Sequence, residues 1–162
     1  MLTVISGGQT GPDRAALEAA TATGTPDGGW CPKDGWAEDL PQPPGILALY
    51  PKLRETPSGE PEQRTDWNVR DSATLLVLVG QGGLAVSKGT MRAVQHAESL
   101  GKPIAIVDVS KPDAIGRALA FLTPFMAEPV CIAGPRESEA PGLQTAARRV
   151  LELVLTEMTS KP

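Results

Sequence analysis

The sequence predicts an α/β fold: a three-layer, Rossmann-like fold with a mostly parallel central sheet and helices on both of its faces. Two observations predict it. Short apolar runs alternate with segments of helical periodicity along most of the chain. The run Thr74–Val79 reads Thr-Leu-Leu-Val-Leu-Val, which is typical of a strand buried on both faces of a parallel sheet. Right-handed crossovers between such strands then give a Rossmann-like layout.

The elements are expected in a regular order. Strands are predicted over residues 2–6, 74–79, 103–109 and 129–133, with one short strand near 29–30. Helices are predicted over residues 12–23, 88–100, 113–122 and 142–159. The last helix carries one apolar face, which includes Leu143, Ala147, Val150, Leu151 and Val154.

The segment Gly24–Asp71 interrupts this alternation. It holds half of the 16 prolines, all three tryptophans and the only tyrosine. Because proline removes backbone donors and fixes φ, long regular elements are not expected here. A loop of this length in a compact domain usually covers or builds a site.

Composition restricts the function classes. The 162 residues fit one domain, 1–162, and the net charge of −4 argues against general nucleic-acid binding, which needs a basic face. Two cysteines are too few for a disulfide framework. The start lacks the pattern of a signal peptide or membrane span, so a cytoplasmic protein without membrane contact is expected. With His96 as the only histidine, no metal site is predicted.

The first strand-to-helix turn, Ser6-Gly7-Gly8-Gln9-Thr10-Gly11, is the strongest candidate site. The glycines let backbone approach a ligand closely, and Pro12 suits the first helical position. Free N–H groups and the positive end of the helix dipole would then attract an anion. The alternative is a tight turn in which the Asp13 carboxylate takes those donors instead.

Other strand ends face the same edge of a parallel sheet, where ligands bind. They read Gly80-Gln81-Gly82-Gly83 and Gly134-Pro135-Arg136-Glu137-Ser138. Gly89-Thr90 begins a helix and offers a second anion-accepting end. The order Lys88-Gly89-Thr90 is not that of a P-loop.

Two stretches within the segment Gly24–Asp71 supply further candidates. Arg64 and Asn68 share a helical face, with Trp67 beside it, and could bind phosphate, base edge and base face. Alternatively, Trp67 fills the core and Arg64 pairs with a carboxylate. Trp30-Cys31-Pro32-Lys33 follows the short strand, and Cys31 is interpreted as a structural or pocket-lining thiol rather than a nucleophile, because no activating base is evident.

Several motifs resemble the "Putative molybdenum carrier" family, a molybdenum cofactor carrier-like group. They are Ser6–Leu17, Gly28–Lys33, Ala37–Asp39, Glu55–Thr56, Arg64–Thr65, Asn68–Val69, Asp71–Ser72, Gly89–Thr90, Gly101–Pro103 and Ala133–Ser138. That family is similar in fold to the lysine-decarboxylase-like cytokinin phosphoribohydrolases. The resemblance implies a phosphate site shared by the Gly7-Gly8 turn and the Gly89-Thr90 helix start. It also implies a homo-oligomer, dimer or tetramer, and molybdenum cofactor (molybdopterin) or a nucleotide as ligand.

One departure from the phosphoribohydrolases bears on activity. Their P-G-G-x-G-T-x-x-E motif ends in a catalytic glutamate, whereas Met91, Arg92 and Ala93 follow Gly89-Thr90 here. The expected function is therefore a carrier or sensor that binds a phosphate-bearing ligand without chemistry. The alternative is a nucleoside 5′-monophosphate phosphoribohydrolase that uses Asp13, Glu38 or Asp71 as acid or base. A third possibility is a structural subunit without a ligand.

The residues expected to bind the ligand or its phosphate come from all of these segments. They are Ser6, Gly7, Gly8, Gln9, Thr10, Asp13, Arg14, Trp30, Lys33, Arg64, Asn68, Gly82, Gly83, Gly89, Thr90, Arg136 and Ser138.

Overall fold

A five-stranded parallel sheet forms the centre of the structure, a computed structural model that describes residues 1–160. Its strands lie in the order β2-β1-β7-β5-β6. They are β1 (Thr3–Ile5), β2 (Asp27–Gly28), β5 (Thr74–Val79), β6 (Ile104–Asp108) and β7 (Pro129–Ala133), and each neighbouring pair is parallel. The predicted α/β, Rossmann-like fold is confirmed.

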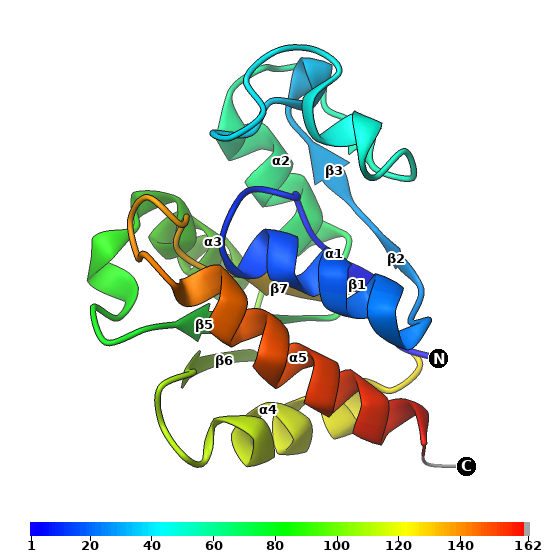
Figure 1. Cartoon of the computed structure of the whole chain (residues 1–162), viewed down its shortest axis with the longest axis vertical. Coiled ribbons are helices and arrows are strands. Elements are labelled where there is room, and N and C mark those ends of the chain that lie inside the picture. The colour runs from blue at the N-terminus through cyan, green and yellow to red at the C-terminus, as the bar shows by residue number, and fades with distance from the viewer. Residues whose placement is uncertain (161–162) are drawn as a thin grey trace.

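Helices cover both faces of this sheet (Figure 1). One face carries α1 (Pro12–Thr23), α4 (Ala114–Leu122) and α5 (Leu143–Thr159), and the other carries α2 (Pro61–Arg70) and α3 (Lys88–Ser99). The central strand β5 shows why, because all six of its residues are buried and they alternate between the two faces. Leu76 and Leu78 pack with α1 and α5, whereas Leu75 and Val77 pack with α3.

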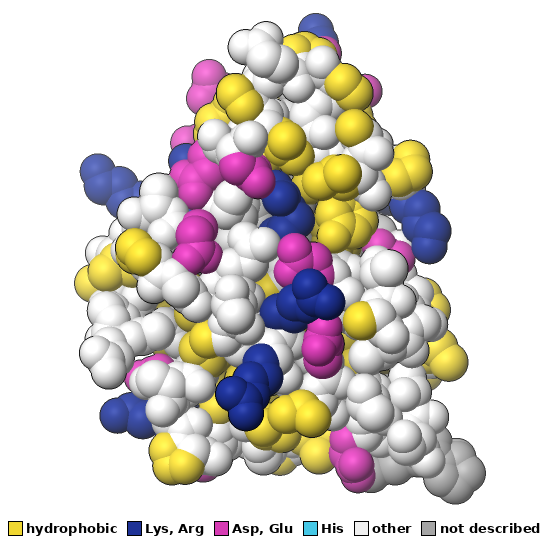
Figure 2. Space-filling view, in the orientation of Figure 1, with side chains coloured by type: hydrophobic (Ala, Val, Ile, Leu, Met, Phe, Trp, Pro, Cys, Tyr) yellow, Lys and Arg dark blue, Asp and Glu magenta, His cyan; other side chains and the backbone are white. Residues whose placement is uncertain are grey.

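The outer surface over α1 and α5 carries charges of both signs. Figure 2 shows Lys and Arg side chains interspersed with Asp and Glu side chains on this face. Arg148 of α5 forms ion pairs with Glu152 of the same helix and with Glu18 of α1. The charges on this face therefore largely balance one another.

Strand β7 is the last strand in the sequence, yet it lies in the middle of the sheet between β1 and β5. If β7 and α5 preceded β1 in the sequence, β7 would be the first strand and β1 the second. The strands of the sheet would then follow the order 3-2-1-4-5, as in the Rossmann layout. The segments that such a rearrangement would join are adjacent, since Met1 and Leu2 line one small cavity together with Leu155 and Met158. The fold is thus a Rossmann arrangement whose first strand–helix unit stands at the end of the sequence.

Residues 29–60 form a cap segment beyond the edge of the sheet, drawn in blue to cyan at the top of Figure 1. It contains the parallel pair β3 (Trp30–Cys31) and β4 (Arg54–Glu55) and two 3₁₀ turns, Lys33–Gly35 and Gly45–Ala48. A small apolar cluster holds it against α1. The cluster consists of Leu17, Cys31, Ile46 and Leu53.

The single short strand expected near residues 29–30 is wrong in detail. Asp27–Gly28 pairs with β1 in the main sheet, and Trp30–Cys31 pairs with β4 in the cap segment. Gly29 separates them with φ of 133°, and a Cβ there would lie 2.2 Å from the Ser6 carbonyl oxygen. The chain leaves the sheet at this glycine because only glycine fits both the conformation and the close approach.

Candidate ligand-binding site

The carboxyl ends of β1 and β7 and the start of α3, the helix that follows β5, border one cavity of about 460 Å³. The strand order reverses between β7 and β5, and ligands of open α/β sheets bind at such a switch point. Eight residues expected from sequence line the cavity: Gly7, Gln9, Asp13, Arg64, Asn68, Gly89, Thr90 and Arg136. Polar residues that the sequence-based set omitted line it as well: Glu62, Thr65, Ser87, Lys88, Arg92 and Glu139.

The remaining expected residues do not line this cavity. They are Ser6, Gly8, Thr10, Arg14, Trp30, Lys33, Gly82, Gly83 and Ser138. Most of them are engaged elsewhere by the protein itself, as the following contacts show. Lys33 is exposed, in the 3₁₀ turn at the start of the cap segment, and Gly82 is exposed in the turn after β5.

The first turn uses its own backbone donors. The N–H groups of Gly8, Thr10 and Gly11 donate to the side chains of Ser6, Gln9 and Gln144 at 3.1, 3.0 and 3.0 Å. The expectation of free N–H groups at this turn is therefore wrong for these three positions. Ser6 acts within the turn, since its hydroxyl also donates to the Asp13 carbonyl oxygen at 2.7 Å.

Asp13 does not take the turn's N–H groups either; it pairs with Arg64. The Arg64 Nη1 donates to Asp13 Oδ2 at 2.9 Å, and both residues are less than a tenth exposed. Burial raises the pKa of Asp13, and the charge and hydrogen bond of Arg64 oppose that rise. A Cβ at Gly7 would lie 2.3 Å from Arg64 Nη1, so glycine at this position makes room for the guanidinium.

Gly8 faces the cap segment rather than the cavity. A Cβ there would lie 2.8 Å from Ile46 Cγ1 and 3.2 Å from a Leu53 methyl group, and φ is 72°. The expectation that Gly8 binds phosphate has no support from this geometry. A carboxylate introduced at Gly8 would be buried against apolar side chains, so it would disturb packing before it disturbed any ligand.

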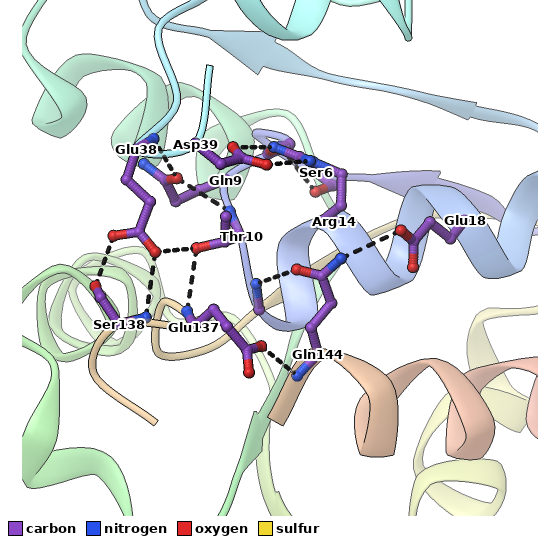
Figure 3. Close-up of polar contacts among 12 residues, drawn as sticks. Ser6, Gln9, Thr10, Arg14, Glu18, Glu38, Asp39, Glu137, Ser138 and Gln144 are labelled. Atoms are coloured by element: carbon purple, nitrogen blue, oxygen red, sulfur yellow. Dashed lines mark hydrogen bonds and ion pairs between the residues drawn. The ribbon is translucent and has the colours of Figure 1, made fainter. Parts of the chain in front are cut away.

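Thr10, Glu38 and Ser138 connect the first turn to two other loops (Figure 3). Glu38 accepts from the Thr10 hydroxyl, and its other carboxylate oxygen accepts from the Ser138 hydroxyl at 2.6 Å. Burial alone would raise the pKa of Glu38, but the hydrogen bonds from Ser138 and Thr10 outweigh it and lower the pKa. These side chains therefore fix loop positions rather than contact a ligand.

Arg14 fastens the cap segment to the same turn. Its Nη atoms donate to both carboxylate oxygens of Asp39 at 3.0 and 2.9 Å, and its Nε donates to the Gly8 carbonyl oxygen at 2.8 Å. The bonds from Arg14 lower the pKa of Asp39. The role of Arg14 in this structure is to position two segments.

Trp67 of α2 packs against Trp30 of the cap segment. Trp30 and Trp67 meet edge to face with centroids 4.7 Å apart, and Trp30 Nε1 donates to Asp71 Oδ2 at 2.8 Å. The Asn68 amide spans the backbone of Trp30, accepting from its N–H at 2.7 Å and donating to its carbonyl at 2.9 Å. Neither indole lines the cavity, so a stacking role for Trp30 gains no support, and the Asn68 side chain is fully used by the protein.

The start of α3 opens into the cavity. Ser87 caps the helix by accepting from the Thr90 N–H at 3.2 Å, and the Thr90 hydroxyl also donates to Ser87 at 2.9 Å. Helix geometry leaves the N–H groups of Lys88 and Gly89 without an intrahelical acceptor. A Cβ on Gly89 would meet no atom within 4 Å, so space remains beside these donors. This helix end meets the requirements of an anion site better than the start of α1.

Arg136 also lines the cavity and adds a positive charge to it. The Arg136 guanidinium lies 5.4 Å from the Trp36 ring centroid, and the Arg136 backbone N–H donates to the Glu139 carboxylate at 2.9 Å. Arg92 also lines the cavity, but it forms a bidentate pair with Asp66 at 2.9 and 2.7 Å. Arg136 and Lys88 are therefore the cavity cations for which no carboxylate partner within 4 Å is found among residues 1–160.

The thiols show no sign of activation. Burial raises the pKa of Cys31 to about 11, and burial raises the pKa of Cys131 as well. A thiol is a poor nucleophile when its pKa is raised, because the thiolate is the reactive form. Over residues 1–160, no group of three or more His, Cys, Asp or Glu side chains could hold a metal ion, and no helix is long and apolar enough to span a membrane.

The fold defines the class: Rossmann-like α/β proteins, here with a cavity at the carboxyl edge of the parallel sheet. The chain belongs to the Circularly permutated YpsA SLOG family, whose model matches residues 4–155. The central position of β7 agrees with that permutation. The resemblance to the molybdenum carrier family is confirmed.

A solved structure is similar over nearly the whole chain. It is the crystal structure of a "Putative molybdenum carrier protein" from Syntrophus aciditrophicus SB, with 33% sequence identity, 94% of each chain covered and a TM-score of 0.81. No curated protein matches the chain.

Proposed function

We propose that this protein binds a phosphate-bearing, nucleotide-like or pterin ligand in the cavity and acts as a carrier or sensor. One observation carries the proposal: the capped start of α3, with unused N–H groups at Lys88 and Gly89, opens into a cavity of about 460 Å³ that Arg136 also lines. Such a volume is within the usual range for small-molecule sites. The phosphate would lie at this helix end, where backbone donors and the helix dipole favour an anion.

Molybdenum cofactor is one candidate ligand, and it is suggested by the name of the similar solved structure. Residues 1–160 hold no cluster of three or more side chains able to bind a metal ion. Such a ligand would therefore be held as cargo through its phosphate and its pterin ring rather than through the metal.

Calorimetric titration tests the proposal. We expect saturable binding of one ligand per chain for a nucleoside monophosphate or for the phosphorylated pterin. The corresponding nucleoside without phosphate should bind at least about tenfold more weakly, because it makes no charge-assisted bonds to the α3 start. Absence of saturable binding to every phosphorylated probe would contradict the proposal.

A phosphoribohydrolase remains the alternative, and Asp13 is the observation that favours it. Of the three carboxylates proposed as acid or base, Asp13 lines the cavity, whereas Glu38 and Asp71 are held by other side chains outside it. Burial raises the pKa of Asp13, which is the direction that favours a general acid, and the charge of Arg64 opposes that rise. Release of free base from a nucleoside monophosphate, lost in Asp13→Asn, would support this activity; no free base at high enzyme concentration would exclude it.

The proposal also includes a homo-oligomer in the cytoplasm, as the family resemblance implies. Its partner is a phosphorylated small molecule rather than nucleic acid or membrane.

A further inference from the structure

We propose that the part of the cavity lined by Gln9, Asp13, Arg64 and Asn68, called the floor below, recognises an oxo group on the ring of the ligand. The site would then select oxo-substituted over amino-substituted heterocycles. The ligand class is a phosphorylated 6-oxopurine or 4-oxopterin. This inference rests on the proposed function, because it assumes that a phosphorylated ligand occupies the cavity.

The first support is the Gln9 side chain, which is 4% exposed and lines the cavity. Its Oε1 accepts from the N–H groups of Thr10 and Glu38, both at 3.0 Å. Two donors on one oxygen fix which way the amide points. The Nε2 is then a buried donor with no acceptor among residues 1–160.

The second support is Arg64, which lies on the same floor and is 8% exposed. Its Nη1 is bound to Asp13, but its Nε is also buried without an acceptor. Buried donors without partners are rare in folded proteins, because each loses its hydrogen bonds to water without replacement. Two of them, on side chains that line one cavity, indicate a missing acceptor.

The neighbouring acceptors of the floor are already engaged. The Asp13 carboxylate accepts from Arg64 and from the Gly134 N–H, and both ends of the Asn68 amide bind the Trp30 backbone. The hydrogen-bonding groups of the floor that lack a partner are therefore donors, Gln9 Nε2 and Arg64 Nε.

The two groups of donors differ in charge. On the floor, the Arg64 charge is balanced by Asp13 at 2.9 Å. At the start of α3, the helix dipole and Lys88 contribute positive charge, and Arg136 also lines the cavity. A phosphate fits the second place, and an uncharged acceptor such as a ring carbonyl fits the first.

A pair of nucleotides tests the inference. Inosine and adenosine 5′-monophosphates carry the same phosphate and ribose and differ at the ring edge, so their affinity ratio reports the floor. We expect inosine monophosphate to bind at least about tenfold more tightly, since an amino group would face buried donors. A phosphorylated 4-oxopterin and its 4-amino analogue form the second pair, which distinguishes a pterin from a purine ligand.

Gln9→Glu assigns the preference to one atom. Glutamate keeps an oxygen for the Thr10 and Glu38 N–H groups and replaces the Nε2 donor with an acceptor, so the ratio should fall to one or below. Gln63→Glu is the matched control, because Gln63 accepts from Ser58 N at 2.8 Å outside the cavity. It should keep the wild-type ratio. Arg64→Lys retains the positive charge opposite Asp13 but lacks the Nε donor, so it should also reduce the affinity ratio. This variant replaces Gln9→Glu in the test if Gln9→Glu does not fold.

The outcomes are distinct. Binding of phosphorylated probes with oxo-to-amino ratios near one in both pairs would overturn this inference and leave the proposed function standing. An unchanged ratio in a folded Gln9→Glu or Arg64→Lys variant would also overturn it. Failure of every phosphorylated probe to bind would overturn both.

Discussion

Asp13→Ala should lower the free energy of unfolding by about 3–5 kcal/mol, because it leaves Arg64 as a buried charge without a partner. Asp13 is 5% exposed and Arg64 is 8% exposed, so the pair is largely shielded from bulk water. The Arg64 guanidinium packs closely against Gly7 of the first turn, and this contact would be lost if the side chain moved out to solvent. Chemical denaturation of the wild type and the variant measures the loss.

Two controls identify the cause. Asp66→Ala removes the partner of Arg92 from a pair of similar geometry whose arginine side chain is 47% exposed, and it should cost about 0–1 kcal/mol. In the Arg64→Met background, Asp13→Ala should cost much less than in the wild type, since no buried charge is left behind. A cost of Asp13→Ala as small as that of Asp66→Ala would show that the ion pair is not buried in solution.

Gly89→Asp should reduce ligand affinity about 100-fold or more while leaving the fold as stable as before. The new carboxylate would stand beside the N–H groups that bind the phosphate, and like charges this close cost several kcal/mol. A Cβ at Gly89 meets no atom within 4 Å, so packing is not disturbed. An acidic residue in the first turn stabilises a helix by about 0.3–1 kcal/mol, so the melting temperature should hold or rise.

Gly116→Asp is the matched control for this variant. Gly116 lies on α4, away from the cavity, and a Cβ there also meets no atom within 4 Å. It adds the same charge, so its affinity for the phosphorylated probe should stay within about twofold of the wild type, as for a distant surface charge. Unchanged affinity in Gly89→Asp would move the phosphate away from the start of α3.

Periodicity and strand-end chemistry predicted the sheet and most helix boundaries from sequence. Thr74–Val79 and Pro129–Ala133 coincide with β5 and β7, since buried parallel strands need continuous apolar runs. The central place of β7 could not be predicted, because neighbouring strands of a sheet need not be neighbours in sequence. The cap segment was missed as structure because its strands are two residues long and have no periodicity to detect.

The site was predicted in outline, but not which residues serve the ligand. Gly7 and Gly8 look alike in sequence, yet Gly7 makes room for Arg64 and Gly8 makes room for Ile46. Thr10, Arg14 and Ser138 are predicted to bind the ligand, whereas in the structure their side chains bind other loops. Such partners come from distant parts of the chain, and local spacing carries no information about them. Ser87, by contrast, had a detectable signal, as a serine directly before the helix that starts at Lys88.

The position of β7 has a consequence for how the chain matures during synthesis. A nascent chain that ends before Pro129 contains the strands of the pairs β1–β2 and β5–β6, but it lacks the strand that joins these two pairs in the folded sheet. Two-stranded units of this kind are marginally stable in water. The cavity would therefore assemble in one late event, when β7 enters between the two pairs and brings Gly134 and Arg136 to the site.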